Sequence, residues 1–226
     1  MREGHISKAF DGELAALHIH VLEMGGLVLD QVREATRAYA DWDTQAAQLV
    51  MDREAQVQRY AAAIFDAQLA LIARRNPVAS DLRAIIALVK TGAELDRAGA
   101  ESRRIARTVL QKGGRPGRGT STDARHLASL ACRLLRQSLE ALDSIDADMA
   151  DEVINHDQDL DSEYAAGLRR LLTRAMENPA RIDTTVEAAF VLKAMERIGD
   201  HARNVSQQVA AMAAQPVART SKLDPA

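Results

Sequence analysis

The sequence predicts an all-α protein, built as a tandem repeat of two antiparallel three-helix bundles with six long helices. Three observations lead to this fold class. Aromatic residues are only 3% of the chain, whereas Ala, Leu, Arg and Glu abound, and this composition favours helices over strands. Apolar residues recur at helical spacing over long stretches. The same order of turn residues occurs twice along the chain, which indicates an internal repeat.

Length and composition restrict the class of protein further. The 226 residues are 47% hydrophobic and 27% charged, as expected of a globular chain with a proper core. The net charge of −3 argues against a dedicated nucleic-acid-binding protein. The only cysteine, Cys132, excludes an internal disulfide, and no uninterrupted apolar run is long enough to span a bilayer. We therefore expect a soluble, intracellular protein.

The first predicted helix covers about residues 5–40. Apolar side chains recur there on one helical face: Leu14, Leu17, Val21, Met24, Val28 and Val32. Gly25 and Gly26 interrupt this face. Since a glycine pair carries no chemistry of its own, we interpret it as a place where another helix packs closely.

Capping and breaking residues delimit the next two helices. Asp43 is the predicted N-cap of a helix over about 44–75, since its carboxylate can accept from the first free backbone N–H groups. Asn76-Pro77 ends that helix, because proline disfavours helical geometry in the residue before it. A third helix follows over about 80–110.

A glycine-rich segment separates the two halves. Residues 112–120 hold four glycines and a proline, the composition of a flexible linker. We expect the first bundle to occupy 1–111 and the second 121–213. The remaining residues, 214–226, are predicted to be a disordered tail.

The second half repeats the capping and helix-breaking residues of the first. Its helices are expected over about 121–143, 147–177 and 181–212. The corresponding features are Asp43 with Asp146, Asn76-Pro77 with Asn178-Pro179, and Asp96-Arg97-Ala98-Gly99 with Glu196-Arg197-Ile198-Gly199, at offsets of 103, 102 and 100. Because helices joined by short turns pack as antiparallel neighbours, each half predicts one three-helix bundle.

The last helix carries an acidic strip made of Glu196, Asp200 and Asn204. Because these residues are four apart, their oxygen-bearing side chains lie on one helical face. Two carboxylates at this spacing repel each other, and a cation bound between them would make the interaction favourable. The core-facing seam of the same helix is Val191, Met195, Ile198, Ala202, Val205 and Val209. The strip is therefore expected on the outer flank of the bundle.

A second acidic pair, Asp157 and Asp161, is expected to face this strip. It lies 17 to 21 residues before Asn178-Pro179, and Glu196 and Asp200 lie 17 to 21 residues after it. In an antiparallel hairpin the two pairs should meet at the same height. All-oxygen ligand sets suit hard cations, so we predict a metal site of Asp157, Asp161, Glu196, Asp200 and Asn204. These residues do not distinguish Mg²⁺, Mn²⁺, iron and Zn²⁺.

The alternative is a solvated acidic face that is neutralised by Arg197 and Arg203. In the first half the matching positions are altered: Glu54 replaces Asp157, Gln58 replaces Asp161, Asp96 replaces Glu196, Ala100 replaces Asp200, and Arg104 replaces Asn204. We therefore predict only a weaker first-bundle site, at Glu54 and Asp96, which is metal-poor or held by Arg104. Any metal should bind mainly in the second bundle.

Taken together, three stretches resemble the PhoU family: Met24-Gly25-Gly26, residues 72–83 and Glu196-Arg197-Ile198-Gly199-Asp200. The resemblance implies two tandem three-helix bundles. It also implies a cytoplasmic accessory protein of the phosphate-specific ABC transporter, which represses the phosphate-starvation response through a sensor histidine kinase. Some members bind iron or other metal clusters at an E/D-x-x-x-D motif in each repeat. Glu196 and Asp200 match that motif, whereas in the first repeat Asp96 matches and Ala100 does not.

By this resemblance the expected partners are the transporter's ATPase subunit and the sensor kinase. The chain should meet a membrane only through these partners. A homodimer is also expected, and the chain should not be an enzyme. Nucleic acid is not expected as a partner because of the net charge. Two other functions stay open at this point: a metal-binding helical scaffold, and a metal-dependent hydrolase that uses the second-bundle carboxylates.

Overall fold

The computed structural model describes residues 3–75, 77, 79–111 and 117–214, and all regular secondary structure among them is helical. This confirms the all-α prediction. The elements are α1 Glu3–Asp41, α2 Thr44–Asp52, α3 Glu54–Arg75, α4 Ala79–Leu110, α5 Arg118–Ser144, α6 Ala147–Glu177, the short 3₁₀ helix η1 Pro179–Arg181, and α7 Ile182–Ala213. Parts of the predicted linker (112–116) and nearly all of the predicted tail (215–226) lie outside the described residues.

Helix α1 is continuous through Gly25 and Gly26. Its predicted apolar face points into the core, with Leu17, Met24 and Val32 fully buried. The segment Ala9–Asp41 is also long enough, and on average apolar enough, to cross a bilayer, although charged residues interrupt it. A single helix of this kind is weak evidence for a membrane span, because a core helix passes the same test. Its buried residues, among them Val21 and Val28, belong to the core.

The predicted second helix is divided at Arg53 into α2 and α3. Asp43 caps α2 as predicted, since its Oδ1 accepts hydrogen bonds from the backbone N–H groups of Gln45 and Ala46, each at 3.0 Å. Arg53 keeps a near-helical backbone, with φ −68° and ψ −15°, so the interruption shifts the helix without reversing it.

The repeat is visible in the backbone as well as in the sequence. Asp146 caps α6 by accepting from the Met149 N–H at 3.0 Å, just as Asp43 caps α2. The residues that precede the two caps, Trp42 and Ile145, are the non-glycine residues with positive φ in the described chain, at 59° and 53°. Both turns therefore use the same left-handed step, which few side chains adopt without strain.

Helix α5 begins at Arg118, three residues before the predicted start. The predicted linker is therefore shorter than 112–120. Gly119 lies inside the helix, where an added Cβ would press against the Arg174 guanidinium of α6. The glycines that suggested a loop thus serve in part as a contact surface for α6.

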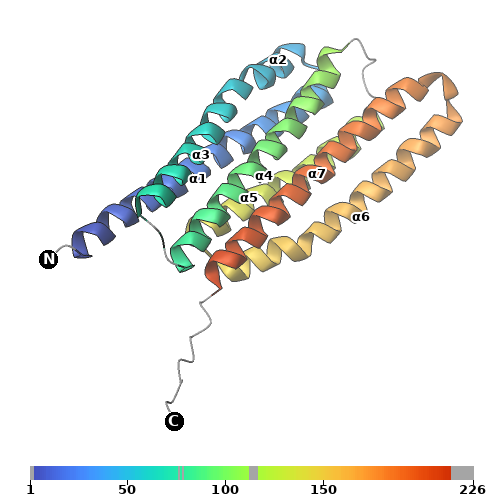
Figure 1. Cartoon of the computed structure of the whole chain (residues 1–226). Coiled ribbons are helices and arrows are strands. Elements are labelled where there is room, and N and C mark those ends of the chain that lie inside the picture. The colour runs from blue at the N-terminus through green and yellow to red at the C-terminus, as the bar shows by residue number, and fades with distance from the viewer. Residues whose placement is uncertain (1–2, 76, 78, 112–116, 215–226) are drawn as a thin grey trace.

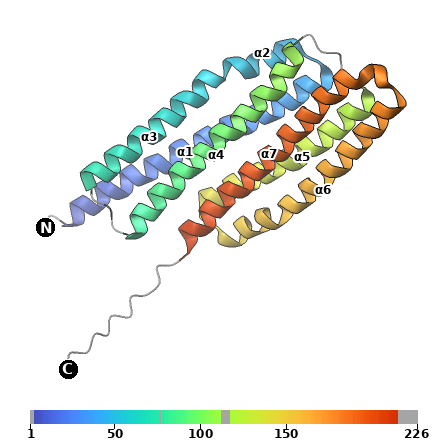
Figure 2. The ribbon, with the colours of Figure 1, turned by 45° about the vertical axis from the view of Figure 1, so that its right-hand side comes forward.

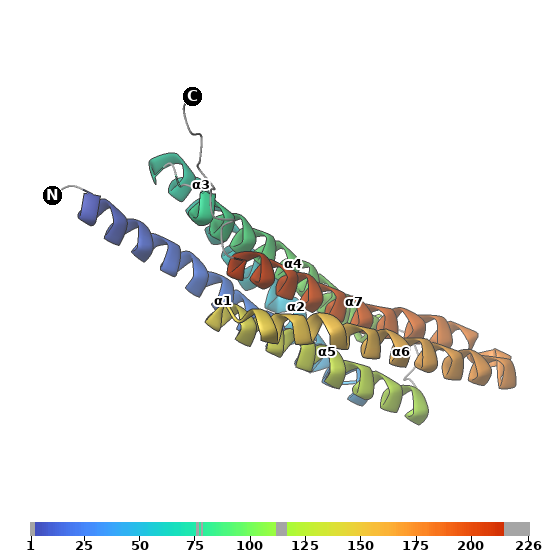
Figure 3. The ribbon, with the colours of Figure 1, turned by 90° about the horizontal axis from the view of Figure 1, so that it is seen from below.

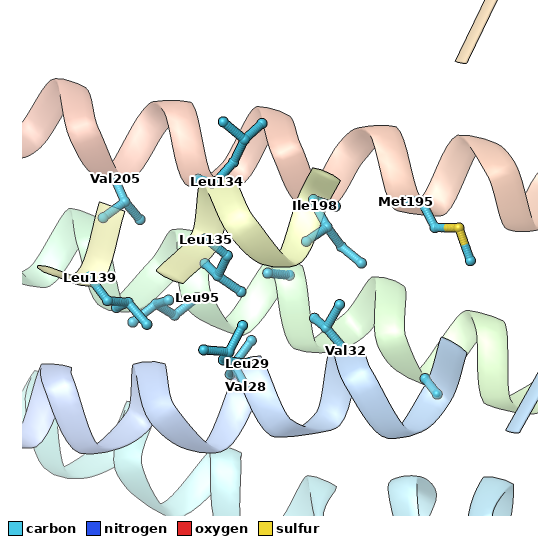
Figure 4. Packing of buried hydrophobic residues seen from close by; sticks show 14 of the residues in the cluster. Val28, Leu29, Val32, Leu95, Leu134, Leu135, Leu139, Met195, Ile198 and Val205 are labelled. Atoms are coloured by element: carbon cyan, nitrogen blue, oxygen red, sulfur yellow. The ribbon is translucent and has the colours of Figure 1, made fainter. Parts of the chain in front are cut away.

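The two bundles lie side by side and share one hydrophobic core. Each is an antiparallel set, α1 with α2–α3 and α4, and α5 with α6 and α7 (Figures 1 and 2). Helices α1, α4, α5 and α7 also contact one another across the bundles, and their apolar side chains meet in the middle (Figure 4). Helix α7 packs against α4, α5 and α6, so it is enclosed on three sides.

Substituting alanine for Gly25 should destabilise the protein by roughly 1–3 kcal/mol, because the new methyl group would overlap the Leu139 side chain of α5. Gly26 is the matched control. An added Cβ there meets nothing within 4 Å, so Gly26→Ala should be neutral or stabilising by up to about 1 kcal/mol through helix propensity. Chemical denaturation of both variants checks this. Equal effects at the two positions would contradict the close-packing interpretation.

Candidate functional site

Helices α6 and α7 meet at the height that the hairpin symmetry predicts. Gly199 on α7 lies against α6, where an added Cβ would clash with Leu160 and come within 3.5 Å of Asp157 Oδ1. Nearer the α6–α7 turn, Lys193 of α7 lies 5.3 Å above the Tyr164 ring of α6. The absence of a side chain at Gly199 therefore allows α7 to approach the acidic segment of α6.

Arg203 occupies the space between two of the predicted ligands. Its Nη1 donates to Asp157 Oδ2 at 2.8 Å, and its Nη2 lies 3.3 Å from Asp200 Oδ1. Asp157 and Asp200 are thus brought together from two helices, as predicted. The charge between them belongs to a guanidinium of the same chain.

Asp157 is buried, with its side chain 3% exposed. Burial raises the pKa of Asp157; the Arg203 charge opposes this shift, and the negative charges of Asp161 and Asp200 add to it. Asp161 itself is exposed. Arg203 therefore pairs with Asp157 and Asp200, and the negative charge of Asp161 is near enough to act on Asp157.

Glu196 is buried, which contradicts its predicted place on the outer flank. Its partner Lys193 lies over the Tyr164 ring of α6, which places Glu196 beside the contact between α6 and α7 rather than on an open flank. Glu196 Oε1 pairs with Lys193 Nζ at 2.5 Å. Partial burial lowers the pKa of Lys193, but the hydrogen bond and charge of Glu196 outweigh it, so the net shift is upward. Glu196 Oε2 is buried and has no hydrogen-bond partner among the described residues.

Asn204 is turned away from the carboxylates and towards the first bundle. Its Nδ2 donates to Glu94 Oε2 of α4 at 3.0 Å, and His201 Nδ1 lies 2.8 Å from the same oxygen. Eight residues separate Glu196 from Asn204, so their side chains differ by about 80° around the helix. That rotation explains why the strip divides between two neighbours of α7.

Glu101 makes a second charged contact between the bundles. Its buried carboxylate lies 3.1 Å from Arg197 of α7 and 3.3 Å from Arg104 on its own helix. Together with Glu94, it joins α4 to α7 from the first bundle. Much of the charge on these helices therefore serves helix–helix contact.

The first-bundle counterpart keeps its charge balance through Arg103. Gln58 Nε2 donates to Glu54 Oε1 and to Asp96 Oδ1, each at 2.9 Å, and Arg103 forms an ion pair with Glu54. The prediction that Arg104 holds this patch is wrong. Arg104 lies eight residues from Asp96 and thus about 80° around the helix, whereas Arg103, seven residues away, shares its face.

Arg103 and Arg203 are therefore equivalent residues of the two repeats. Each pairs with the carboxylate at the matching position of the middle helix, Glu54 or Asp157. Their offset of 100 is the offset of the neighbouring E/D-R-x-G blocks, so the signal was present in the sequence. Glu94 and Lys193 are among the other residues that sequence reasoning missed. The positions that match them in the other repeat are alanines, Ala194 and Ala93, so the repeat did not mark them.

The predicted ligands do not fit a metal ion in the arrangement described. Arg203 neutralises Asp157 and Asp200, Lys193 neutralises Glu196, and Asn204 is bonded to α4. Within the described ranges, no group of three or more His, Cys, Asp or Glu side chains is placed to hold a metal. Metal binding stays a prediction, and it requires Arg203 to move.

Fold and site together define a class: a tandem helical-bundle protein whose buried charges hold neighbouring helices in register. The chain belongs to the PhoU family. The family model for the PhoU domain matches it twice, over residues 21–109 and 124–209. The two matches fall on the two repeats, which confirms the family resemblance.

Relatives of this chain share most of its length. It is 38% identical over 207 residues to the phosphate-specific transport system accessory protein PhoU homolog of Pseudomonas aeruginosa, covering 91% of this chain and 85% of the relative. It is 33% identical over 203 residues to the phosphate-specific transport system accessory protein PhoU of Escherichia coli, covering 90% and 84%.

Solved structures agree with the fold. The crystal structure of PhoU from Pseudomonas aeruginosa matches with a TM-score of 0.86 at 36% identity, over 90% of this chain and 98% of that one. PhoU from Streptococcus pneumoniae matches with a TM-score of 0.81 over 90% and 96%, and at 24% identity it supports the fold alone. The family consists of accessory regulatory proteins, which confirms the prediction of a non-enzyme and removes the hydrolase alternative.

Proposed function

We propose that this chain is a cytoplasmic accessory protein of phosphate uptake that represses the phosphate-starvation response by linking the phosphate ABC transporter to a sensor histidine kinase. The observation that carries the proposal is the near-full-length identity of 33–38% with proteins named for the phosphate-specific transport system. A homodimer in solution belongs to the same proposal.

Exposed apolar side chains support a linking role. Large hydrophobic residues that stay exposed gather near the α3–α4 turn and near the α6–α7 turn, the corresponding hairpins of the two repeats. They are Phe65, Leu69, Ile72 and Ile86 in the first repeat, and Leu172, Met176, Ile182, Val186 and Phe190 in the second. The two hairpins lie at opposite ends of the molecule (Figure 1). Exposed apolar patches of this kind mark protein–protein contact sites.

A genetic experiment tests the proposal. Deleting the gene should raise expression of a phosphate-regulated reporter at high phosphate, and the wild-type chain should restore repression. Leu69→Glu/Ile72→Glu and Met176→Glu/Phe190→Glu should each fail to restore it, and each should lose co-purification with one partner. Leu49→Glu is the matched control, because Leu49 is 58% exposed on α2, away from both hairpins. Unchanged reporter expression in the deletion strain would refute the regulatory role.

Metal binding in the second bundle is the other part of the proposal. The donors would be carboxylates of Asp157, Asp161, Glu196 and Asp200, a set that suits a hard cation. Glu196 Oε2 supports it, because a buried carboxylate oxygen without a hydrogen-bond partner is free to bind a metal ion. The guanidinium of Arg203 competes for the same oxygens.

Replacing Arg203 with Met should therefore increase the affinity for Mn²⁺ by at least about tenfold, since the competing cation is removed. Calorimetric titration of chelator-treated protein measures this. Adding Asp200→Asn to the Arg203→Met variant should abolish the gain. If wild type and Arg203→Met bind Mn²⁺ equally, Arg203 does not guard the site.

A further inference from the structure

A groove between α1 and α5 gathers arginines from both helices. It is an open groove with a volume of about 520 Å³, which is within the usual range of small-molecule sites. Its lining consists of Arg33, Thr36 and Arg37 from α1, and of Arg125, Ala128, Ser129, Cys132, Arg133 and Arg136 from α5. Five of these side chains are guanidinium groups, and none is a carboxylate. Helices α1 and α5 belong to different repeats, and they lie together in Figure 3.

Most of the groove's arginines are paired only with exposed carboxylates at its edge. Arg33 lies 3.4 Å from Asp30, one turn away on α1, and Arg136 lies 3.9 Å from Glu140 on α5. Both pairs are about half exposed or more, and such surface pairs contribute about 0–1 kcal/mol. The guanidinium groups can therefore turn towards a ligand at small cost.

The other edge of the groove follows the same pattern. Arg125 lies 2.7 Å from Asp41, and Arg37 lies 3.0 Å from Glu34. Arg133 has no ion pair within the part of the chain that the structure describes. It is the guanidinium best placed to engage an anion directly.

The floor of the groove is neutral. Thr36 and Ala128 are buried there, and burial raises the pKa of the Cys132 thiol to about 11, although the Arg33 charge opposes the shift. The thiol is therefore uncharged at neutral pH. An anion that enters the groove would meet guanidinium groups at the walls and no negative charge at the floor.

The length of the arginine row indicates the kind of anion. Arg125 and Arg136 are eleven residues apart on one helix, which is roughly 16 Å along the axis. One phosphate group cannot contact guanidinium groups spread over that distance. Because guanidinium pairs with phosphate oxygens through two parallel hydrogen bonds, several phosphoryl groups in a row would match the groove.

We propose that the α1–α5 groove binds a small molecule carrying several phosphoryl groups, such as a nucleoside triphosphate or a short inorganic polyphosphate. Phosphate headgroups of a membrane would offer the same chemistry, and the experiment below separates the two sources. This site is separate from the α6–α7 carboxylates and from both hairpin patches, so it does not depend on the proposed function.

Binding of inorganic tripolyphosphate, ATP, inorganic phosphate and phosphatidylglycerol vesicles to the full-length protein tests the proposal. By calorimetry in about 0.15 M salt, where exposed charges are well screened, tripolyphosphate or ATP should bind more tightly than inorganic phosphate. Arg33→Gln/Arg133→Gln should weaken that binding by at least about tenfold. The matched control is Arg83→Gln/Arg169→Gln, which removes the same charge from exposed positions outside the groove and should leave affinity unchanged.

Cys132 offers an independent readout, because it is the only cysteine and lines the groove. Saturating tripolyphosphate should slow its alkylation severalfold in wild type and not in Arg33→Gln/Arg133→Gln. Should that double variant not fold, Arg133→Gln alone replaces it. The proposal is overturned if vesicles bind while soluble polyphosphates do not, if inorganic phosphate binds as tightly as tripolyphosphate, or if both double variants lose affinity equally.

Discussion

Replacing Arg203 with Met is expected to destabilise the protein by roughly 2–4 kcal/mol at pH 7, since a buried carboxylate loses its counter-charge. Replacing the other member of the pair, Asp157, with Asn should change stability by less than about 1 kcal/mol. The asymmetry follows from exposure, because the Arg203 side chain is 35% exposed and Asp157 only 3%. Without its partner, the charged group of Arg203 would still be hydrated, whereas the buried carboxylate of Asp157 would not.

The difference in stability between Asp157→Asn and wild type should also depend on pH. The pKa of Asp157 is raised in the folded state, so its ionisation opposes folding, and stability is lost as the pH rises through the folded pKa. Asp157→Asn removes that loss. The variant should therefore gain relative to wild type at neutral pH, and the gain should vanish below the unfolded value of about 3.9.

Chemical denaturation in the presence of a chelator measures both variants. Arg136→Met is the control, because Arg136 lies 3.9 Å from an exposed Glu140 and should contribute less than about 0.5 kcal/mol. Equal losses for Arg203→Met and Arg136→Met would show that the buried pair has no special weight.

Most of the fold could be predicted because helices are specified locally. The caps at Asp43 and Asp146 accept from N–H groups two or three residues away, so the sequence alone places them. The seam through Met195, Ile198 and Val205 is buried as its spacing requires. The break at Arg53 was missed, since no proline or glycine marks it.

The packing of one bundle on the other could not be read from the sequence. The apolar periodicity of α7 places Glu196 and Asn204 off the seam of its own bundle, and this periodicity carries no information about α4. The contact with α4 gives Asn204 an acceptor in Glu94, 110 residues away. The repeat predicts which helices form each bundle, but it does not predict which faces of the two bundles pack together.

The sequence predicted which carboxylates face each other, but not which arginine pairs with them. The facing of Asp157 and Asp200 follows from the hairpin alone, and the structure confirms it. The arginine that pairs with such a carboxylate is set by its spacing along the helix. A side chain seven residues away is rotated by about 20° and shares the face, whereas one eight residues away is rotated by about 80° and does not. That difference decided the first bundle in favour of Arg103, and the same spacing relates Glu196 to Arg203.

Replacing Glu94 with Gln is expected to cost roughly 2 kcal/mol at pH 7, because one carboxylate accepts from Asn204 and His201 and also pairs with Arg97 at 2.6 Å. Burial alone would raise the pKa of Glu94. The hydrogen bonds from Asn204 and His201, and the charges of His201 and Arg97, more than offset it, so the pKa is lowered. The ionised form is thus the one that folding stabilises.

A lowered pKa means that this contribution is present above the unfolded value of about 4.3 and is lost as the pH falls through the folded value. The gap in stability between wild type and Glu94→Gln should therefore be widest near pH 7 and close in acid, the reverse of the trend for Asp157→Asn. Glu140→Gln, an exposed control, should stay within about 0.5 kcal/mol of wild type at every pH. A gap that does not close in acid would mean that Glu94 joins α4 to α7 through its shape rather than its charge.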